Sequence, residues 1–229
     1  MNQDYYYASK IEEDIKLFIL ADGMGGYKGG EIASSLAVNS TKNYIYNNFN
    51  KISKERDSIL KLIIDAIEFA NLIVYEKSTE NKDLHEMGTT LEVCLVYNSK
   101  AFIGHVGDSR IYRIRKNIMR KLTKDHSYVE NLIKDGTITQ EQAYNHPKKN
   151  MLTKALGCNS LVEPQVMCRG FVKDDIILMC SDGLTNMLKE NEIYKILLEN
   201  PEGPVEALIK ASNELGGYDN ITAIIIDNI

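Results

Sequence analysis

The chain has 229 residues, of which 44% are hydrophobic and 26% are charged, a composition typical of a folded globular protein. Its length is enough for one large domain with a substantial core. The 27 lysines and arginines against 32 aspartates and glutamates give a net charge of −5, which excludes the broad basic field of a nucleic-acid-binding protein.

The first half of the chain predicts a strand, a glycine-rich turn, two helices and three further strands. An apolar run at 16–21 ends in the turn at 22–30, and apolar residues then recur at helical spacing from Glu31 and again over 60–74. We expect these two helices to pack as a pair. The pattern changes to alternation over 90–97, 101–106 and 110–115, which predicts three strands in one antiparallel meander.

The second half predicts a polar insertion followed by strands and a second helix pair. Residues 125–150 are polar, with Gly136 as a helix stop and Thr139 and Gln142 as a capping box. Strands are expected at 176–180 and 221–226, separated by helices at about 190–198 and 205–215. Helices that arrive in pairs between antiparallel strands favour a layered α+β sandwich over an alternating βαβ fold.

The sequence gives little support for a zinc site, a membrane span or secretion. The four cysteines form no Cys-x-x-Cys pair and have no histidine at zinc-ligand spacing. The apolar runs fall far short of the roughly 20 residues that cross a bilayer, and the N-terminus is acidic and polar, unlike a secretory signal. We therefore expect one continuous domain over 1–229, in the cytoplasm, without membrane insertion.

Four aspartates share one kind of position, because each is predicted at the end of a strand or in a turn beside a small residue. They are Asp22, Asp108, Asp182 and Asp219. For a single Asp-Gly pair, a structural turn is the better interpretation. Four together are different, since clustered carboxylates repel one another unless they surround cations. Carboxylates with a backbone carbonyl and water are the ligands of Mg²⁺ or Mn²⁺, and paired cations of this kind suggest metal-assisted phosphoester hydrolysis.

Two other phosphate chemistries are excluded. No cysteine is followed by an arginine six residues later, so the Cys-x5-Arg loop of cysteine phosphatases is absent. The glycine-rich segment lacks the Gly-Lys-Ser/Thr of a P-loop, and Lys28 stands where a dinucleotide-binding motif needs its third glycine.

Motifs along nearly the whole chain resemble the bacterial members of the metal-dependent PPM (PP2C-type) protein serine/threonine phosphatases. The matching segments, in family order, are Asn2-Gln3-Asp4, residues 20–26 with Gly30-Glu31, Gly88-Thr89-Thr90, residues 104–112, residues 122–126, residues 146–157, residues 181–184 and residues 217–220. The resemblance implies a four-layer α-β-β-α sandwich with two central antiparallel sheets flanked by helix pairs. It also implies a mobile flap subdomain at about 127–151 that tunes the choice of protein substrate.

The resemblance also assigns roles at the site, which holds two or three Mn²⁺ or Mg²⁺ ions per chain. Asp22 would bridge two cations, and the carbonyl of Gly23 would bind one of them. Asp182 and Asp219 would complete the first site, and Asn220 would support the nucleophilic water or its ligands. The second site would contain Asp4, with Gln3, and bind its cation largely through waters, and Asp108 would lie with Asp182 at a third position.

Three departures from the family pattern accompany this resemblance. The family's phosphate-clamping arginine, three residues before Asn2, and its first β-strand would both fall before Met1, so we expect a sheet edge without that partner and weaker phosphate binding. The sequence is consistent with a truncated form of a longer protein; Lys28 or Arg110 would otherwise approach the phosphate. Met24 occupies the place of a histidine proposed as general acid in eukaryotic relatives, which leaves that role to a metal-bound water or to Asp108.

The resemblance thus implies a monomeric Mn²⁺- or Mg²⁺-dependent phosphatase that hydrolyses phosphoserine and phosphothreonine in proteins by a metal-bridged water. Its implied partners are phosphorylated proteins, including a bacterial serine/threonine kinase of the PASTA type that it would oppose. The alternative is a pseudophosphatase with the same fold, which binds phosphoproteins without turning them over. The retained carboxylates argue against that alternative, because they would destabilise a fold that binds no metal.

Overall fold

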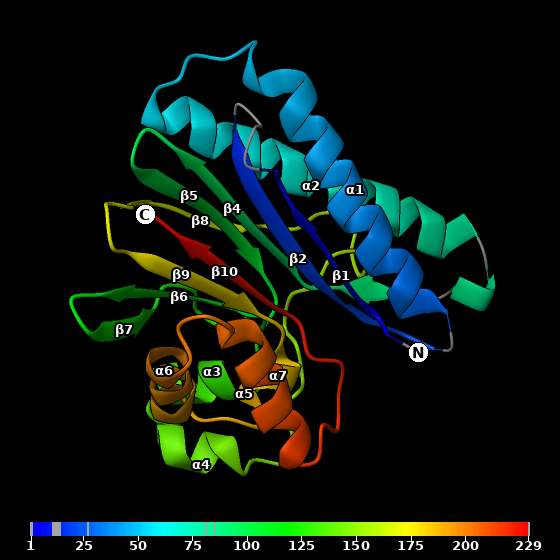
Figure 1. Ribbon diagram of the computed structural model, residues 1–229. Helices are drawn as coiled ribbons and strands as arrows, with labels where there is room; N and C mark the ends of the chain where they lie inside the picture. Colours follow the sequence, from blue (N-terminus) through cyan, green and yellow to red (C-terminus); the bar gives the residue numbers. More distant parts are fainter. Residues whose placement is uncertain (1, 11–14, 27, 81, 85, 229) are drawn as a thin grey trace.

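The computed structural model describes residues 2–10, 15–26, 28–80, 82–84 and 86–228. In this part of the chain two antiparallel sheets lie face to face between two sets of helices (Figure 1). The first sheet has the order β1-β2-β4-β5-β8, with β3 paired to the end of β2. Its strands are β1 (Asp4–Ala8), β2 (Lys16–Met24), β3 (Gly88–Thr89), β4 (Leu91–Tyr97), β5 (Lys100–Val106) and β8 (Gln165–Gly170).

The second sheet has the order β10-β9-β6-β7. Its strands are β6 (Arg110–Arg115), β7 (Ile118–Lys121), β9 (Ile176–Cys180) and β10 (Ala223–Asp227). The helices are α1 (Gly29–Phe49), α2 (Arg56–Glu80), α3 (Tyr128–Lys134), α4 (Gln140–Tyr144), α5 (Asp182–Thr185), α6 (Glu190–Glu199) and α7 (Pro204–Glu214), with a short 3-10 turn at Lys82–Leu84.

Alternation along the central strands divides the apolar residues between separate cores. In β2, Ile19 packs toward α1 and α2, whereas its neighbour Leu20 packs between the two sheets. In β4, Val93 and Cys94 divide in the same way. A third core, which includes Leu178 and Leu184, lies between the second sheet and α5 to α7. Successive side chains of a strand point to opposite faces, so this pattern confirms the predicted four-layer α-β-β-α sandwich.

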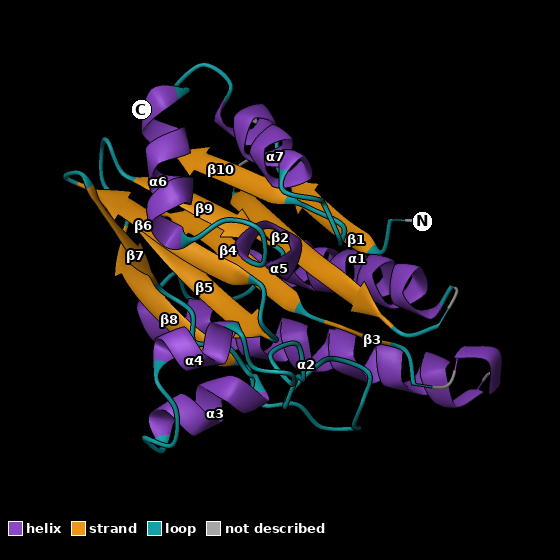
Figure 2. Cartoon of the chain, turned by 90° about the horizontal axis from the view of Figure 1, so that it is seen from below, coloured by secondary structure: helices purple, strands orange, loops and turns teal. Residues whose placement is uncertain are grey.

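The predicted helix pairs are present. α1 packs on α2 over the outer face of the first sheet, and α6 contacts α7 over the outer face of the second; in Figure 2 the two pairs lie on opposite sides of the strands. In the polar insertion, α3 ends just before Gly136, whose φ is +72°. Thr139 accepts a hydrogen bond from the Gln142 amide while the Gln142 side chain accepts one from Thr139, so the capping box is confirmed.

The predicted meander is wrong at its third strand. β4 pairs with β5, but β6 leaves that sheet and pairs with β9 and β7. The change of sheet follows Gly107, whose φ of +116° is a conformation that L-amino acids rarely adopt. The turn at 107–109 therefore takes the chain from the first sheet to the second, and Asp108 lies in this turn between β5 and β6.

Four strands and one short helix were not predicted from the sequence, and one of the strands, β3, has only two residues. β1 is a tyrosine-rich edge strand, β7 has four residues, and β8 alternates only weakly, so each lacks a strong period-two signal. The single-turn helix α5 directly follows β9. No helix within the described residues is long and apolar enough to cross a membrane.

Candidate metal centre

Asp4 and Asp22 face each other across two neighbouring strands. They are register partners in the antiparallel pair of β1 and β2, and Asp22 lies inside β2, two residues before its end, rather than at the strand end that the sequence predicts. Like charges directly opposite each other in a sheet destabilise it. The sequence therefore places two like charges opposite each other in the part of the site that the first sheet forms.

Two threonines hold the backbone of Asp22. The Asp22 amide donates to Thr90 Oγ1 at 2.9 Å, and the Asp22 carbonyl accepts from Thr89 Oγ1 at 2.9 Å and from the Thr90 amide at 2.9 Å. Thr90 Oγ1 also lies 2.9 Å from Ser109 Oγ, in the turn that contains Asp108. These contacts fix the position of Asp22 relative to that turn.

Asp182 lies at the first position of α5, directly after β9. Asn186, one helical turn later, donates from Nδ2 to Asp182 Oδ2 at 2.9 Å. The preceding residue, Ser181, donates from Oγ to Asp4 Oδ2 at 2.9 Å and accepts from the Thr222 amide at 3.0 Å. Ser181 thus links the end of β9 to the carboxylate on β1 and to the last strand.

Asp219 and Asn220 lie in the loop before β10, which begins at Ala223 and not beside Asp219 as predicted. The Asn220 amide donates to Asp219 Oδ1 at 2.8 Å, and Asn220 Oδ1 accepts from the Gln3 amide at 2.7 Å. Asn220 therefore joins the C-terminal loop to the segment that carries Asp4.

Two glycines allow the backbones of the site to approach closely. A Cβ on Gly183 would lie 2.0 Å from the Asn220 carbonyl oxygen, and one on Gly23 would lie 2.1 Å from the Gly30 carbonyl oxygen. Any other residue at these positions would overlap with backbone atoms. The glycine beside Asp182 is thus needed to bring the 182 and 219–220 segments together.

Asp108 lies across the site on the turn from β5 to β6. The Gly107 amide donates to His126 Nδ1 at 3.1 Å, and the His126 amide donates to the Gly107 carbonyl at 2.7 Å. Asp108 and Asp182 both line a cavity of about 780 Å³ that extends under α3 and α4. The structure thus brings all five predicted aspartates into one region of the fold.

Burial and mutual repulsion raise the pKa values of four of the clustered aspartates, so their negative charge favours the binding of protons or cations. Burial, followed by the charges of Asp4, Asp182, Asp108 and Asp219, raises the pKa of Asp22 to about 10. Burial and the charge of Asp182 raise the pKa of Asp108 to about 8. Burial is also the leading cause of the raised pKa values of Asp4 and Asp182. Carboxylates this crowded hold protons or bind cations.

The donor set has the chemistry of a hard-cation site. Oδ1 of Asp4 and Oδ1 of Asp182 are buried without a hydrogen-bond partner within the described residues, and buried carboxylate oxygens need one. As the side chains stand, no three His, Cys, Asp or Glu residues of the described part converge on one point as metal ligands do. The fit is therefore one of oxygen donors and charge, and it suits Mg²⁺ or Mn²⁺ better than zinc.

The two candidate substitutes for a phosphate clamp differ in their surroundings. Arg110 forms a bidentate pair with Asp125, with 2.7 Å from Nη2 to Oδ2 and 3.2 Å from Nε to Oδ1, and Lys121 Nζ lies 3.2 Å from Oδ1 of the same carboxylate. The Arg110 guanidinium is thus already engaged, although it lines the same cavity as Asp108. Lys28 is exposed at the start of α1.

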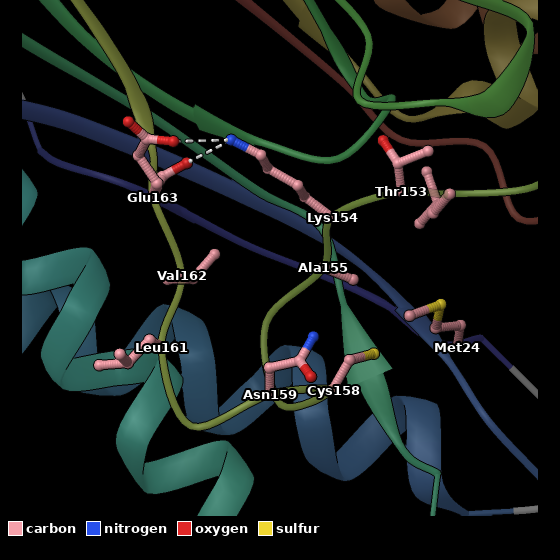
Figure 3. Close-up of a pocket in the computed structure, with 10 residues that line it drawn as sticks. Met24, Thr153, Lys154, Ala155, Cys158, Asn159, Leu161, Val162 and Glu163 are labelled. Atoms are coloured by element: carbon pink, nitrogen blue, oxygen red, sulfur yellow. Dashed lines mark hydrogen bonds and ion pairs between the residues drawn. The ribbon is translucent and has the colours of Figure 1, made fainter. Parts of the chain in front are cut away.

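Met24 lines a second cavity, of about 320 Å³, on the other side of the end of β2. Figure 3 shows it facing the segment from Thr153 to Glu163, with Cys158 and Leu161 also around the cavity. Lys154 Nζ lies 3.2 Å from Glu163 Oε2, so its charge is paired. A thioether carries no proton to transfer, so Met24 shapes this cavity without acting as a general acid.

Sequence reasoning missed the residues that orient the carboxylates. Thr90 and Ser181 lie inside matching motifs but received no role, because a hydroxyl beside a strand end has many structural uses. Asn186 follows Asp182 at i+4, a spacing that places both side chains on one helical face. That spacing is a signal that the sequence does contain.

Comparisons with known proteins identify the family of the chain. The model of the family described as protein phosphatase 2C matches residues 1–215. The serine/threonine phosphatase Stp of Listeria monocytogenes is 35% identical over 229 residues, which cover 99% of this chain and 90% of that protein. The solved serine/threonine phosphatase of S. agalactiae is 34% identical with a TM-score of 0.89, and the match covers 100% of this chain and 94% of that one.

A further solved structure contains metal. The catalytic domain of the serine/threonine protein phosphatase PstP, determined in complex with two manganese ions, is 31% identical with a TM-score of 0.84 and covers 99% of this chain and 91% of its own. Family model, relatives and solved structures all point to one family. The chain therefore belongs to the protein phosphatase 2C family of metal-dependent protein serine/threonine phosphatases.

Proposed function

We propose that this chain uses two or three Mn²⁺ or Mg²⁺ ions to hydrolyse phosphoserine and phosphothreonine in proteins. The observation that carries the proposal is the crowding around Asp22. Burial and four neighbouring carboxylates raise the pKa of Asp22 to about 10. Two buried carboxylate oxygens beside it have no hydrogen-bond partner among the described residues. Divalent cations satisfy both conditions.

The ligand roles are those that the family resemblance implies, and the neighbours of Asp22 support them. Asp22, between Asp4 on one side and Asp182 on the other, would bridge two cations, with the Gly23 carbonyl on one of them. Asp182 and Asp219 would complete the first site, and Asp4 would serve the second. A third cation would bind between Asp108 and Asp182, which line the same cavity.

The chain's own residues prepare the site for this chemistry. Paired cations supply an acidified water and neutralise the phosphoryl oxygens. Thr90, Ser181 and Asn186 hold Asp22, Asp4 and Asp182 by hydrogen bonds of 2.9 Å, so little reorganisation is needed when charge develops. Asn220 fixes the loop of Asp219 against Gln3.

Substrate choice would lie in residues 127–151, which we propose as a flap over the site. Ser127, Val129 and Ile133 line the 780 Å³ cavity beside Asp108 and Asp182, and Tyr144 and Asn150 line it from the rest of the segment. A cavity lined by Asp108 and Asp182 together with apolar and polar side chains suits a peptide segment that would place its phosphate at the cations.

Such a hydrolase consumes the product of a particular reaction class. Phosphoserine and phosphothreonine arise when a protein kinase transfers a phosphoryl group to a hydroxyl, so we propose that this chain opposes a serine/threonine kinase. A membrane kinase of the PASTA type would be one such partner.

The test is phosphate release from a phosphothreonine peptide with Mn²⁺, Mg²⁺ or EDTA, beside a phosphotyrosine peptide. We expect turnover of phosphothreonine that needs the metal and falls by about 10²-fold or more in Asp182→Asn, because a lost metal ligand removes several kcal/mol of transition-state stabilisation. Asp174→Asn is the matched control, because Asp174 is exposed and precedes β9, whereas Asp182 follows the opposite end of that strand. Peptide binding without turnover in any metal would indicate a phosphoprotein-binding pseudophosphatase instead.

A further inference from the structure

A second cluster of charge, this time positive, lies on the hairpin of β6 and β7. Arg113 and Arg115 project from the same face of β6, and Arg113 is the register partner of Arg120 on β7. Lys116 lies in the tight turn, where its φ is +49°. Arg169 of β8 adds its charge to this group. We call Arg113, Arg115, Lys116, Arg120 and Arg169 the distal basic cluster.

The cluster is poorly neutralised. Its nearby carboxylate, Asp175, is bound by Arg115, with 2.6 Å from Nε to Oδ1, and it also accepts from the Val172 amide at 2.8 Å. Within the described ranges, the other four cations have no carboxylate within 4 Å. The whole chain has a net charge of −5, so this positive charge is a local excess, and it would attract an anion.

Repulsion within the cluster is visible at Arg113. Removal from water and the neighbouring guanidiniums of Arg115, Arg120 and Arg169 hold the pKa of Arg113 below its usual range. Arg113 and Arg120, as like charges opposite each other in a ladder, also destabilise the hairpin. A bound anion would relieve both effects.

The cluster also has the shape of a small binding site. Arg113, Arg115, Lys116, Ile118 and Arg120 line a cavity of about 200 Å³. Nη1 of Arg113 donates to the Gly170 carbonyl at 3.3 Å, but its Nε is buried and has no acceptor among the described residues. A buried guanidinium N–H without a partner is rare and costly, and here it lies among the walls of the cavity.

This site is separate from the metal centre. Arg110 begins β6 next to Asp108, and Arg115 ends it, so five residues of extended chain separate the two by about 17 Å. In Figure 1 the β6–β7 hairpin lies on the left, whereas β2 and β9 end toward the right. The proposed hydrolysis uses none of the distal residues.

We propose that the distal basic cluster is a second anion site, which binds a phosphate-class tetrahedral oxyanion away from the metal centre. Guanidinium groups offer paired N–H donors that match such oxygens, and a dianion would neutralise the Arg113 and Arg120 pair. The same phosphoryl chemistry is present in inorganic phosphate and in a phosphorylated side chain, and the experiment separates these sources.

The test follows backbone amide NMR shifts of the full chain in EDTA, so that no metal centre competes for phosphate. Inorganic phosphate is titrated in one arm and a phosphothreonine peptide in another, each against sodium chloride of equal ionic strength. We expect saturable shifts at residues 113–120 and Gly170, with at least tenfold weaker binding in the variant Arg113→Gln/Arg120→Gln. Tighter binding of the peptide than of phosphate would identify a phosphorylated protein segment as the ligand.

Two controls make the result decisive. Lys195→Gln/Lys210→Gln removes the same charge from two exposed positions on α6 and α7, and it should bind phosphate as the wild type does. The arginine variant should keep its metal-dependent hydrolysis of a small phosphomonoester and show a higher melting temperature at low salt without phosphate, because the repulsive pair is gone. Shifts that stay linear, that chloride reproduces, or that both double variants weaken equally would overturn the proposal.

Discussion

The hydroxyl of Thr90 ties Asp22 to the turn of Asp108. It accepts from the Asp22 amide and contacts Ser109 Oγ, both at 2.9 Å. Thr90→Val keeps the shape but leaves a buried amide and hydroxyl unpaired, so we expect about 1–3 kcal/mol of destabilisation and slower phosphate release. Urea unfolding and initial rates check this, with the exposed helical Thr79→Val as control. Unchanged values in Thr90→Val would show that the hydroxyl does not position Asp22.

Glu92 and His105 form a fully buried pair between the layers. His105 Nδ1 lies 2.6 Å from Glu92 Oε1, and its Nε2 lies 2.9 Å from the Lys124 carbonyl. A carbonyl only accepts, so Nε2 carries a hydrogen. Burial raises the pKa of Glu92 well above its usual range and lowers the pKa of His105 to about 4. The pair is therefore neutral, with the Glu92 proton donated to Nδ1.

This pair gives stability a defined pH dependence. From the ordinary glutamate value of 4.5 to the ordinary histidine value of 6.5, the folded and unfolded pairs each bind one proton, so the pair adds no slope. Above pH 6.5 the unfolded pair has no proton, whereas the folded pair keeps its proton until the pH passes the raised pKa of Glu92, so stability falls as pH rises over that range. Below pH 4.5 the unfolded pair binds two protons, so stability falls as pH falls.

Glu92→Gln should remove the decline at high pH. The amide keeps a donor for His105 but binds no proton, so the variant loses a slope of up to about 1.4 kcal/mol per pH unit above pH 6.5. As pH falls from 6.5 to about 4, His105 binds a proton in the unfolded variant but not in the folded one, so the variant loses stability over this range. Urea unfolding from pH 5 to 9 measures this, with the exposed Glu76→Gln as control. Parallel curves for wild type and Glu92→Gln would refute a neutral pair.

At the scale of residues, the sequence predicts the candidate metal ligands better than the residues that orient them by hydrogen bonds. The aspartates at 22, 108 and 182 stand out because each has a glycine neighbour at a predicted strand end or turn. Ser181, by contrast, donates to the Asp4 carboxylate across 177 positions of the sequence, a contact that forms only once β1 and β9 are assembled. Long-range hydrogen bonds of this kind have no local pattern, so reasoning from spacing alone does not find them.

Among the elements, the junction of β9 and α5 depends on the small size of Gly183. A Cβ there would lie 2.0 Å from the Asn220 carbonyl oxygen, so Gly183→Ala must separate Asp182 from the 219–220 loop. We expect about 1–3 kcal/mol of destabilisation together with weaker Mn²⁺ binding, measured by thermal unfolding and by Mn²⁺ titration. Gly26→Ala, where a Cβ meets nothing within 4 Å, is the control. Equal behaviour of the two variants would contradict the close approach.

Elements with strong periodicity were predicted, and those shaped by tertiary contacts were not. The helices α1, α2, α6 and α7 and the strands β4, β5 and β9 follow clear apolar patterns. β1 and β7 are sheet-edge strands whose residues gain order by pairing with β2 and β6. The crossing of β6 into the second sheet depends on the backbone of Gly107, and periodicity within a strand does not encode it.

At the scale of the whole molecule, the sandwich itself creates the site. Asp4 and Asp22 come from the first sheet, Asp182 and Asp219 from segments flanking β9 and β10 of the second, and Asp108 from the turn between the sheets. The two sheets share an apolar core that includes Leu20 and Met179. A rigid apolar core therefore holds five mutually repelling carboxylates at one edge, and part of the stability of the fold is given up to make a cation site.

The most direct test of this account counts the cations. Titration of the metal-free chain with Mn²⁺, followed by calorimetry and by the loss of the free-ion electron paramagnetic resonance signal, should give two or three ions per chain. Asp22→Asn, which removes the bridging carboxylate, should lose at least one of them, whereas the exposed Asp174→Asn should bind as the wild type does. A wild-type chain that binds no Mn²⁺, or an Asp22→Asn variant that binds the full number with equal affinity, would contradict the assignment of this cluster as the metal centre.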